Sequence, residues 1–135
     1  MPSDRRYTNI YSQMASDIQK DAEVKLGRPL SDLEANSIRN AGSLLMLESV
    51  AMGMDHAKTA EDVAAQLADA ASGFPQRLID AHSDVTTSLE SKLNRPLKTL
   101  ESELVAGIPN CLVAMLVLHN VEDASAISNV SEVIP

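Results

Sequence analysis

Three histidines are the side chains of this chain best suited to binding a metal ion: His56, His82 and His119. A metal site on helices needs Glu-x-x-His or His-x-x-x-His, because these spacings place both ligands on one face. Neither spacing occurs. His119 and Asp123 are four residues apart, but Asn120 is expected to begin a new helix between them, and His82 falls in an apolar stripe typical of a core or boundary position. We therefore predict no metal site and no cofactor.

Nucleophilic catalysis is not indicated either. Cys111 is the single cysteine, and it lies in the apolar run Asn-Cys-Leu-Val-Ala-Met, where low polarity raises the pKa of a thiol. No nucleophile elbow, phosphate-binding loop or dinucleotide glycine pattern is present. Adjacent acids could be imagined as a general acid and base, but residues one or two apart on a helix do not face each other. These pairs are Glu61 and Asp62, Glu101 and Glu103, and Glu122 and Asp123. We predict no catalytic residue and a chain that is not an enzyme.

Arg28 and Arg95 occupy equivalent places in a sequence that occurs twice. The ten residues Lys-Leu-Gly-Arg-Pro-Leu-Ser-Asp-Leu-Glu, 25–34, return as Lys-Leu-Asn-Arg-Pro-Leu-Lys-Thr-Leu-Glu, 92–101, with seven identical positions. Chance would give about one identity. Each arginine could bind helix carbonyls and a neighbouring carboxylate, or it could bind an acidic partner or an anion. Both arginines are therefore candidate partner-binding residues.

The elements that carry these residues are expected to be helices. Apolar residues make up 44% of the 135, but aromatic residues only 2%, so the core must consist of Leu, Val, Ile, Met and Ala. Apolar positions recur every three or four residues, and no stretch alternates at period two as a strand would. The sequence therefore predicts an all-α fold.

Glycine, proline and capping residues divide the chain into six expected helices. Gly27 and Asn94 suit the left-handed residue that ends a helix, and Pro75 suits a first turn. Ser-Asp-Leu-Glu at 31–34 is a capping box. Gly107 and Pro109 are expected to kink the fifth helix. The expected helices span about 4–26, 32–54, 60–72, 75–93, 97–118 and 121–130.

A second correspondence extends the repeat. Thr-Ala-Glu-Asp at 59–62 resembles Asn-Val-Glu-Asp at 120–123, which suggests two copies of a three-helix unit with a shortened middle in the second copy. The copies span about 4–72 and 74–133. A lone unit of this size buries only a modest core. We therefore expect one domain, 1–135, in which six helices interleave about a pseudo-twofold axis around a shared interior.

Methionines and leucines mark the surface on which a partner is expected. Two apolar segments, 44–54 and 111–118, are hydrophobic around more than half of a helix. Either they are central helices or they meet another chain, and the small number of helices favours a contact with another chain. The candidate partner-binding residues on these segments are Met46, Met52, Met54, Met115 and Leu118. A homodimer is one expected form of this contact.

Charge excludes some partners. Acidic residues outnumber basic ones by 19 to 11, giving a net charge of −8, which disfavours direct binding of nucleic acid. No signal peptide is evident, and the apolar stretch 104–121 contains Pro109, Asn110 and His119, so we interpret it as a buried helix and not a membrane span. A lone cysteine favours a reducing, cytoplasmic location.

The leading hypothesis is a small, acidic, non-enzymatic helical protein that binds another protein. Adaptors, chaperones and inhibitors made by phages or other mobile elements fit this description. One alternative is an acidic nucleic-acid mimic that inhibits a basic target. The other is a helical sensor or enzyme that holds a small ligand beside Pro109, Asn110 and His119.

Overall fold

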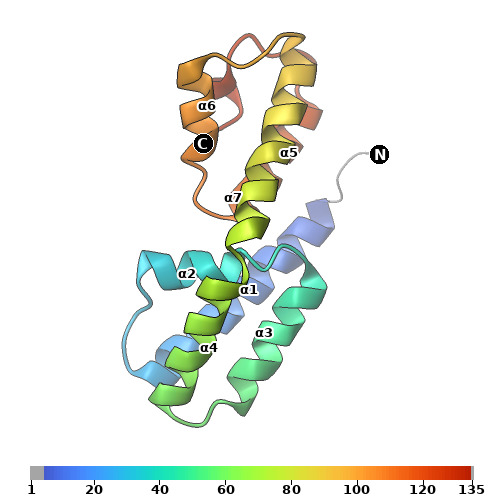
Figure 1. Cartoon of the computed structure of the whole chain (residues 1–135). Helices are drawn as coiled ribbons and strands as arrows, with labels where there is room; N and C mark the ends of the chain where they lie inside the picture. Colours follow the sequence, from blue (N-terminus) through green and yellow to red (C-terminus); the bar gives the residue numbers. More distant parts are fainter. Residues whose placement is uncertain (1–4, 135) are drawn as a thin grey trace.

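The computed structural model describes residues 5–134, and within that range it is all-α, with no strand. Figure 1 shows the arrangement of its seven α-helices and one short 3₁₀ helix. The helices are α1 (Arg5–Leu26), α2 (Asp32–Arg39), α3 (Leu44–His56), α4 (Ala60–Gly73), α5 (Pro75–Leu93), α6 (Thr99–Ala106), α7 (Cys111–Asp123) and the 3₁₀ helix η1 (Val130–Glu132). Asp4, where the first helix was expected to begin, lies outside the described residues. No helix in the described range has the length and hydropathy that crossing a membrane requires.

Several helix ends lie where the sequence predicts them. Gly27 and Asn94 adopt left-handed conformations, with φ of 73° and 58°, directly after α1 and α5. Ser31 and Glu34 form the expected capping box at the start of α2. Thr59 caps α4, and Pro75 occupies the first turn of α5. These ends are set by local backbone chemistry, which is why sequence reasoning finds them.

The second expected helix is broken. It ends at Arg39, and a connection through Gly42, whose φ is +87°, leads to Ser43, which caps α3 by accepting a hydrogen bond from the amide of Met46. The break changes the phase of α3 relative to α2. Leu45 and Met52, which one continuous helix would turn inward, are exposed, and Leu47 and Met54 are buried instead.

The fifth expected helix is broken too, and the sixth is absent. Pro109 does not kink a helix but precedes Asn110, which caps α7. Asn120 was expected to begin a new helix, but α7 continues through it to Asp123. Beyond Asp123 the described chain has only the 3₁₀ helix η1. A capping residue can lie within a helix when its side chain bonds elsewhere, and the Asn120 side chain donates to the carbonyl of Val133 at 3.0 Å.

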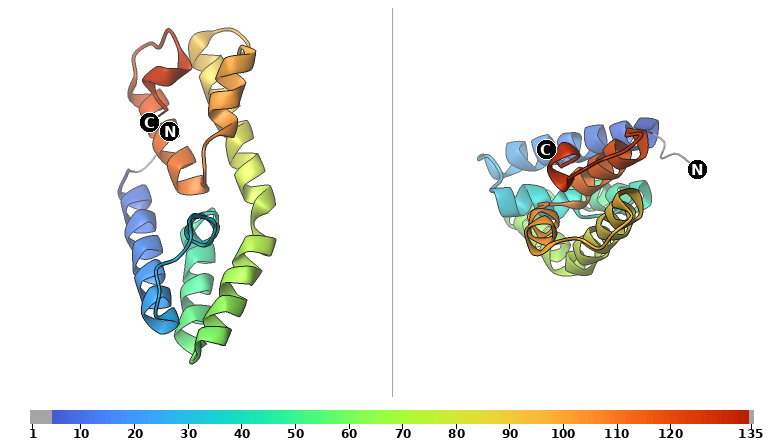
Figure 2. Two further views of the ribbon diagram at one scale, coloured as in Figure 1. Left: turned by 90° about the vertical axis from the view of Figure 1, so that its left-hand side faces the viewer. Right: turned by 90° about the horizontal axis from the view of Figure 1, so that it is seen from above.

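The buried apolar side chains form two clusters in place of the single interior that was expected. The first belongs to α1–α4, which we call the first lobe, and it also includes Leu112 of α7. The second belongs to α5–α7 and η1, the second lobe. Figure 2 shows the resulting elongated outline, with α5 leading from one lobe to the other.

The expected pseudo-twofold between the halves is not seen. Between the lobes α1 packs against α7, and a twofold would equally pack α5 against α3. The main neighbours of α3 in the described chain are instead α1, α2 and α4, whereas α5 packs chiefly against α6 and α7. The contact between the lobes is therefore one-sided.

The two turns that follow α1 and α5 have the same internal contacts. Arg28 donates two hydrogen bonds to the Glu34 carboxylate, at 2.8 and 3.0 Å, and one to the carbonyl of Pro29. In the other turn Arg95 donates to Glu101 at 2.7 and 2.9 Å, and to the carbonyl of Pro96. We call each arrangement a clasped turn. An arginine fork and a carboxylate make two parallel, charge-assisted bonds, so each turn is held in one geometry.

A second glutamate strengthens each clasped turn from the preceding helix. Glu23 accepts a hydrogen bond from the amide of Leu30 at 2.8 Å, and Glu90 accepts one from Leu97 at 3.0 Å. The backbone amides that lie beyond the helix end are thereby satisfied. The recurring sequence thus encodes a recurring turn.

The connection between α2 and α3 is bound to α1 by two tyrosines. The Tyr11 hydroxyl is buried, donates to the carbonyl of Arg39 at 2.5 Å and accepts from the amide of Gly42 at 2.9 Å. Burial raises the pKa of this phenol, so it stays protonated. The Tyr7 hydroxyl accepts from the amide of Leu44, the first residue of α3. These bonds fix where α2 ends and α3 begins.

We predict that acid weakens the fold through the clasped turns. The arginine bonds, with the Ser31 and Lys98 amides, lower the pKa of Glu34 and of Glu101 from 4.5 to about 2. A lowered folded-state pKa contributes stability above the unfolded value, which is lost as pH falls toward the folded value. Thermal melts should therefore show Tm falling from about pH 5 to about pH 2. The E34Q/E101Q double variant should show a smaller fall, whereas E103Q, which alters an exposed glutamate of α6, should follow the wild type.

We predict that Y11F destabilises the protein more than Y7F. Y11F leaves the partly buried amide of Gly42 and carbonyl of Arg39 without the buried hydroxyl that bonds both, which costs roughly 1–3 kcal/mol. Y7F removes one bond at a partly exposed site, where water can replace the hydroxyl. Urea unfolding followed by circular dichroism measures both. Equal losses would mean that the Tyr11 bonds do not hold the connection.

Candidate protein-binding surface

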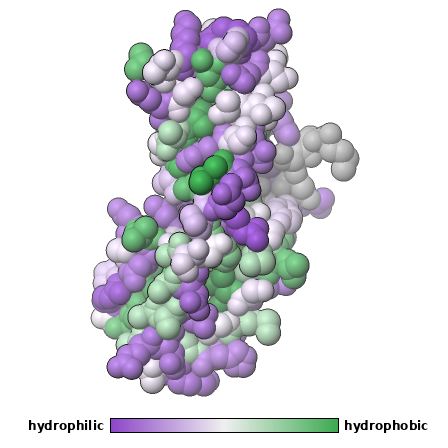
Figure 3. Space-filling view, viewed as in Figure 1, coloured by the Kyte–Doolittle hydropathy of each residue, from purple (hydrophilic) through white to green (hydrophobic). Residues whose placement is uncertain are grey.

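The most exposed large apolar side chains of α3 lie on one face. Leu45 is 72% exposed and Met52 62% exposed, and the two residues are seven positions apart, which is about two helical turns. Glu48 and Ser49, between them, are also exposed. We call Leu45, Glu48, Ser49 and Met52 the α3 face. Figure 3 shows apolar surface on the first lobe, including the side on which α3 lies.

A shallow groove borders the α3 face. It has a volume of about 160 Å³, and it runs between α3 and α4 from Met46 and Ser49 to Asp69 and Phe74. Met46 is partly buried, with its side chain against the first cluster. Ser49 belongs to both the groove and the α3 face, so the two are continuous. Aromatic and methionine side chains at the edge of a groove are adaptable contact surface.

Met54 does not belong to this surface. It is 1% exposed and lies inside the first cluster, so a partner cannot reach it in this conformation. Sequence reasoning grouped it with Met52 because the two are neighbours, but residues two apart point to opposite sides of a helix. It also placed Leu45 inward, because it did not foresee the break at Gly42.

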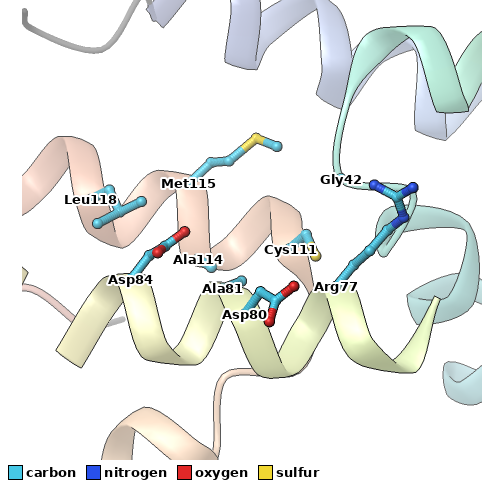
Figure 4. A pocket seen from close by; sticks show the side chains of 9 residues that line it. All are labelled: Gly42, Arg77, Asp80, Ala81, Asp84, Cys111, Ala114, Met115 and Leu118. Carbon is cyan, nitrogen blue, oxygen red and sulfur yellow. The ribbon is translucent and has the colours of Figure 1, made fainter. Parts of the chain in front are cut away.

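Met115 and Leu118 lie in a different groove, between α5 and α7. This groove has a volume of about 250 Å³, and Figure 4 shows the side chains around it. Its other members are Gly42, Arg77, Asp80, Ala81, Asp84, Cys111 and Ala114. Arg77 is directed toward the connection at Gly42, and its guanidinium lies 5.6 Å from the centre of the Phe74 ring. The candidate residues of α3 and of α7 are therefore not brought together into one site.

Cys111 is buried at the end of this groove. Burial, together with the nearby Asp80, raises the pKa of the thiol to about 11, although Arg77 acts in the opposite direction. The backbone amide of Cys111 donates to the Asn40 side chain at 3.0 Å. A protonated, buried thiol is a poor nucleophile. Cys111 is therefore not an activated nucleophile in this conformation.

Polar side chains also join the two lobes. The buried Thr8 hydroxyl and Nε2 of the buried His119 share a hydrogen bond of 2.6 Å. The Asn110 side chain donates to Asn36 at 2.8 Å and accepts from the amide of Val113, which caps α7. The sequence offered Asn110 and His119 as contacts for a small ligand. In the structure the amide group of Asn110 and Nε2 of His119 are already hydrogen-bonded to other residues of the chain.

The other two histidines lie in different surroundings. His82 donates from Nε2 to the carbonyl of Ile108 at 2.9 Å, and His56 is exposed at the end of α3. Across residues 5–134 no group of three or more histidine, cysteine or acidic side chains is arranged to hold a metal ion.

Arg28 and Arg95 lie at opposite ends of the molecule. Figure 1 shows the turn between α1 and α2 at the lower end and the turn between α5 and α6 at the upper end. Each guanidinium is bound to a glutamate of its own turn. The two arginines therefore cannot bind one small anion together. Any partner would meet a guanidinium group that is already hydrogen-bonded to a glutamate.

Comparisons with protein families, with curated proteins and with solved structures found no match for this chain.

We predict that Asn110 contributes more to stability than Ser43, which caps α3 in the same way. N110A removes the cap and the bond to Asn36, whereas S43A removes only a cap, worth about 0.5–2 kcal/mol. N110A should therefore cost roughly 1 kcal/mol more than S43A in urea unfolding. N110S, which can keep the cap but cannot reach Asn36 in the same way, should fall between them. A loss no larger in N110A than in S43A would show that the bond between the lobes adds nothing.

Proposed function

We propose that this chain is a non-enzymatic protein that binds another protein through the α3 face and the groove beside it. The observation that carries the proposal is the exposure of Leu45 and Met52, two turns apart on one helix, next to the groove at Met46 and Phe74. A helix that presents apolar residues at this spacing suits packing against a partner helix. Burying one such side chain completely contributes about 1.5–3 kcal/mol.

The use of the acidic residues supports protein binding over nucleic-acid mimicry. Glu23, Glu34, Glu90, Glu101 and Glu132 all accept hydrogen bonds from backbone amides of the chain. These carboxylates serve caps and turns, and they are not left as a row of free charges. A mimic of the phosphate backbone would need such a row on its surface.

The proposed biological role is that of an adaptor, a chaperone or an inhibitor. An adaptor, a chaperone or an inhibitor would each use an adaptable apolar face on a small, rigid helical body. A cytoplasmic location suits the single buried thiol of Cys111.

We also propose that the two halves are copies of one unit. Support comes from α6 and α7, which begin and end 67 residues after α2 and α3, and from the two clasped turns at the same offset. Val63 and Val130, at that offset, are both buried in their own clusters. The proposed copies are in tandem, and they are not exchanged by a twofold.

Photo-crosslinking tests the binding surface. A photoreactive phenylalanine analogue replaces Met52 in one variant, Leu45 in a second and Thr87, an exposed residue of α5, in a third. On irradiation in native lysate, positions 52 and 45 should give the same crosslinked protein, and position 87 should not. Mass spectrometry identifies the product.

Competition provides the control for this experiment. Excess unlabelled wild-type chain should abolish the product, whereas an L45E/M52E variant should not, because two charges on the α3 face oppose apolar packing. Both altered side chains are exposed, so circular dichroism should show an unchanged fold. Equal products at positions 52 and 87, or products that wild-type chain does not compete away, would refute the proposed function.

A further inference from the structure

The face of α7 that matches the α3 face is covered within the chain. At the 67-residue offset, Leu112 and His119 correspond to Leu45 and Met52. Leu112 is 8% exposed and belongs to the first cluster, and His119 is 3% exposed and bonded to Thr8. Helix α1 packs on α7 and covers His119 through Thr8, whereas Leu112 packs into the first cluster, to which α1 contributes Tyr11 and Ala15. The α1–α7 contact thus indicates what kind of surface covers such a face. It is the first turns of the long helix with which a proposed copy begins, which is α1 in the first copy and α5 in the second.

The counterpart of that covering surface is free on α5. In α1 the residues that reach α7 include Arg5, which pairs with Asp123, and Thr8. The corresponding residues are Ser72, at the end of α4, and Pro75, the first residue of α5, and both are exposed. One turn further on, Ile79 is 58% exposed. The molecule therefore has two exposed surfaces, the α3 face and the start of α5, that correspond to the two sides of the α1–α7 contact.

The chain cannot make this second contact with itself in the structure described. Its own α5 is held against α6 and α7 by buried residues such as Val85 and Leu89, and α3 packs chiefly against α1, α2 and α4. A second molecule has no such restriction. In repeat proteins each unit buries its apolar face on the next, and an outermost unit usually closes its free face with polar residues. The α3 face is not closed in this way, because Leu45 and Met52 are exposed on it.

We infer that the partner of the α3 face is a second copy of this chain. The start of α5 in one molecule, Pro75 to Ile79, packs on Leu45 and Met52 of the other and continues the α1–α7 interface across the two chains. This inference rests on the proposed function, since it names the partner of the same surface. The two surfaces differ, so a closed dimer forms when two molecules exchange the contact reciprocally, which gives an isologous interface with twofold symmetry.

Disulfide trapping between single-cysteine variants tests the inference. Thr8 and His119 meet at 2.6 Å, so their counterparts Pro75 and Met52 should face each other across the interface. Two variants, M52C and P75C, each also carry C111A so that the added thiol is the sole one. They are mixed and oxidised with diamide, which accepts two electrons and two protons as the disulfide forms. A disulfide-linked species of twice the 14.5 kDa chain mass, containing one of each variant, is expected.

A matched pair supplies the control. K20C/C111A carries its thiol at an exposed position of α1 outside the inferred contact, and mixing it with P75C/C111A should give little mixed disulfide. A yield with M52C no greater than the yield with K20C would overturn the inference. The added thiols replace exposed residues, and the buried substitution C111A is common to all three variants, so the comparison between M52C and K20C does not depend on it.

Light scattering provides a second measurement on the unmodified chain. Wild-type protein eluting from a size-exclusion column should show a mass that rises with concentration above that of the monomer, and I79E or L45E should restore the monomer mass. A strict monomer at every concentration would overturn self-association. It would leave the proposed function standing if photo-crosslinking at Met52 still captures a different protein, so the two failures are distinguishable.

Discussion

Two hydrogen bonds of the Tyr11 hydroxyl determine the course of the first lobe. They bind the carbonyl of Arg39 and the amide of Gly42, and so they hold α2 and α3 apart as separate helices. Asn40, between those residues, reaches across to the amide of Cys111 and the start of α7. One short connection therefore sets the direction of α3, the phase of its side chains and the attachment of the second lobe. The exposure of Leu45 and Met52 follows from that phase.

The contacts between the two lobes differ in kind from the contacts inside each lobe. Inside each lobe the contacts are mostly apolar, with Leu, Val, Ile and Ala in the clusters. Between the lobes, polar pairs such as Thr8 with His119 and Asn36 with Asn110 are prominent, accompanied by Leu112. Buried hydrogen bonds are directional, so they specify one orientation where apolar packing alone tolerates several. No buried side-chain nitrogen or oxygen among the described residues lacks a partner, so this orientation leaves no polar group unsatisfied.

Sequence reasoning succeeded where the cause is local and failed where it is distant. Gly27, Asn94, Ser31 and Pro75 act on neighbouring backbone, so their roles follow from residue type and spacing. The break before Ser43 also had a local signal, since a glycine and a serine precede an apolar run, but the strong apolar periodicity obscured it. The pairing of Thr8 with His119 joins residues 111 apart, and no spacing rule reveals such a contact. The α3 face depends on the break, so it could not be derived without it.

Both tyrosines of the chain bind the same connection, and the chain has no tryptophan. Absorbance and emission in the near ultraviolet therefore originate almost entirely from two rings at one joint. Natural fluorescence is usually an average over a whole molecule. Here it is a local optical reporter, built into the native sequence, of whether α2 and α3 still meet at their proper angle.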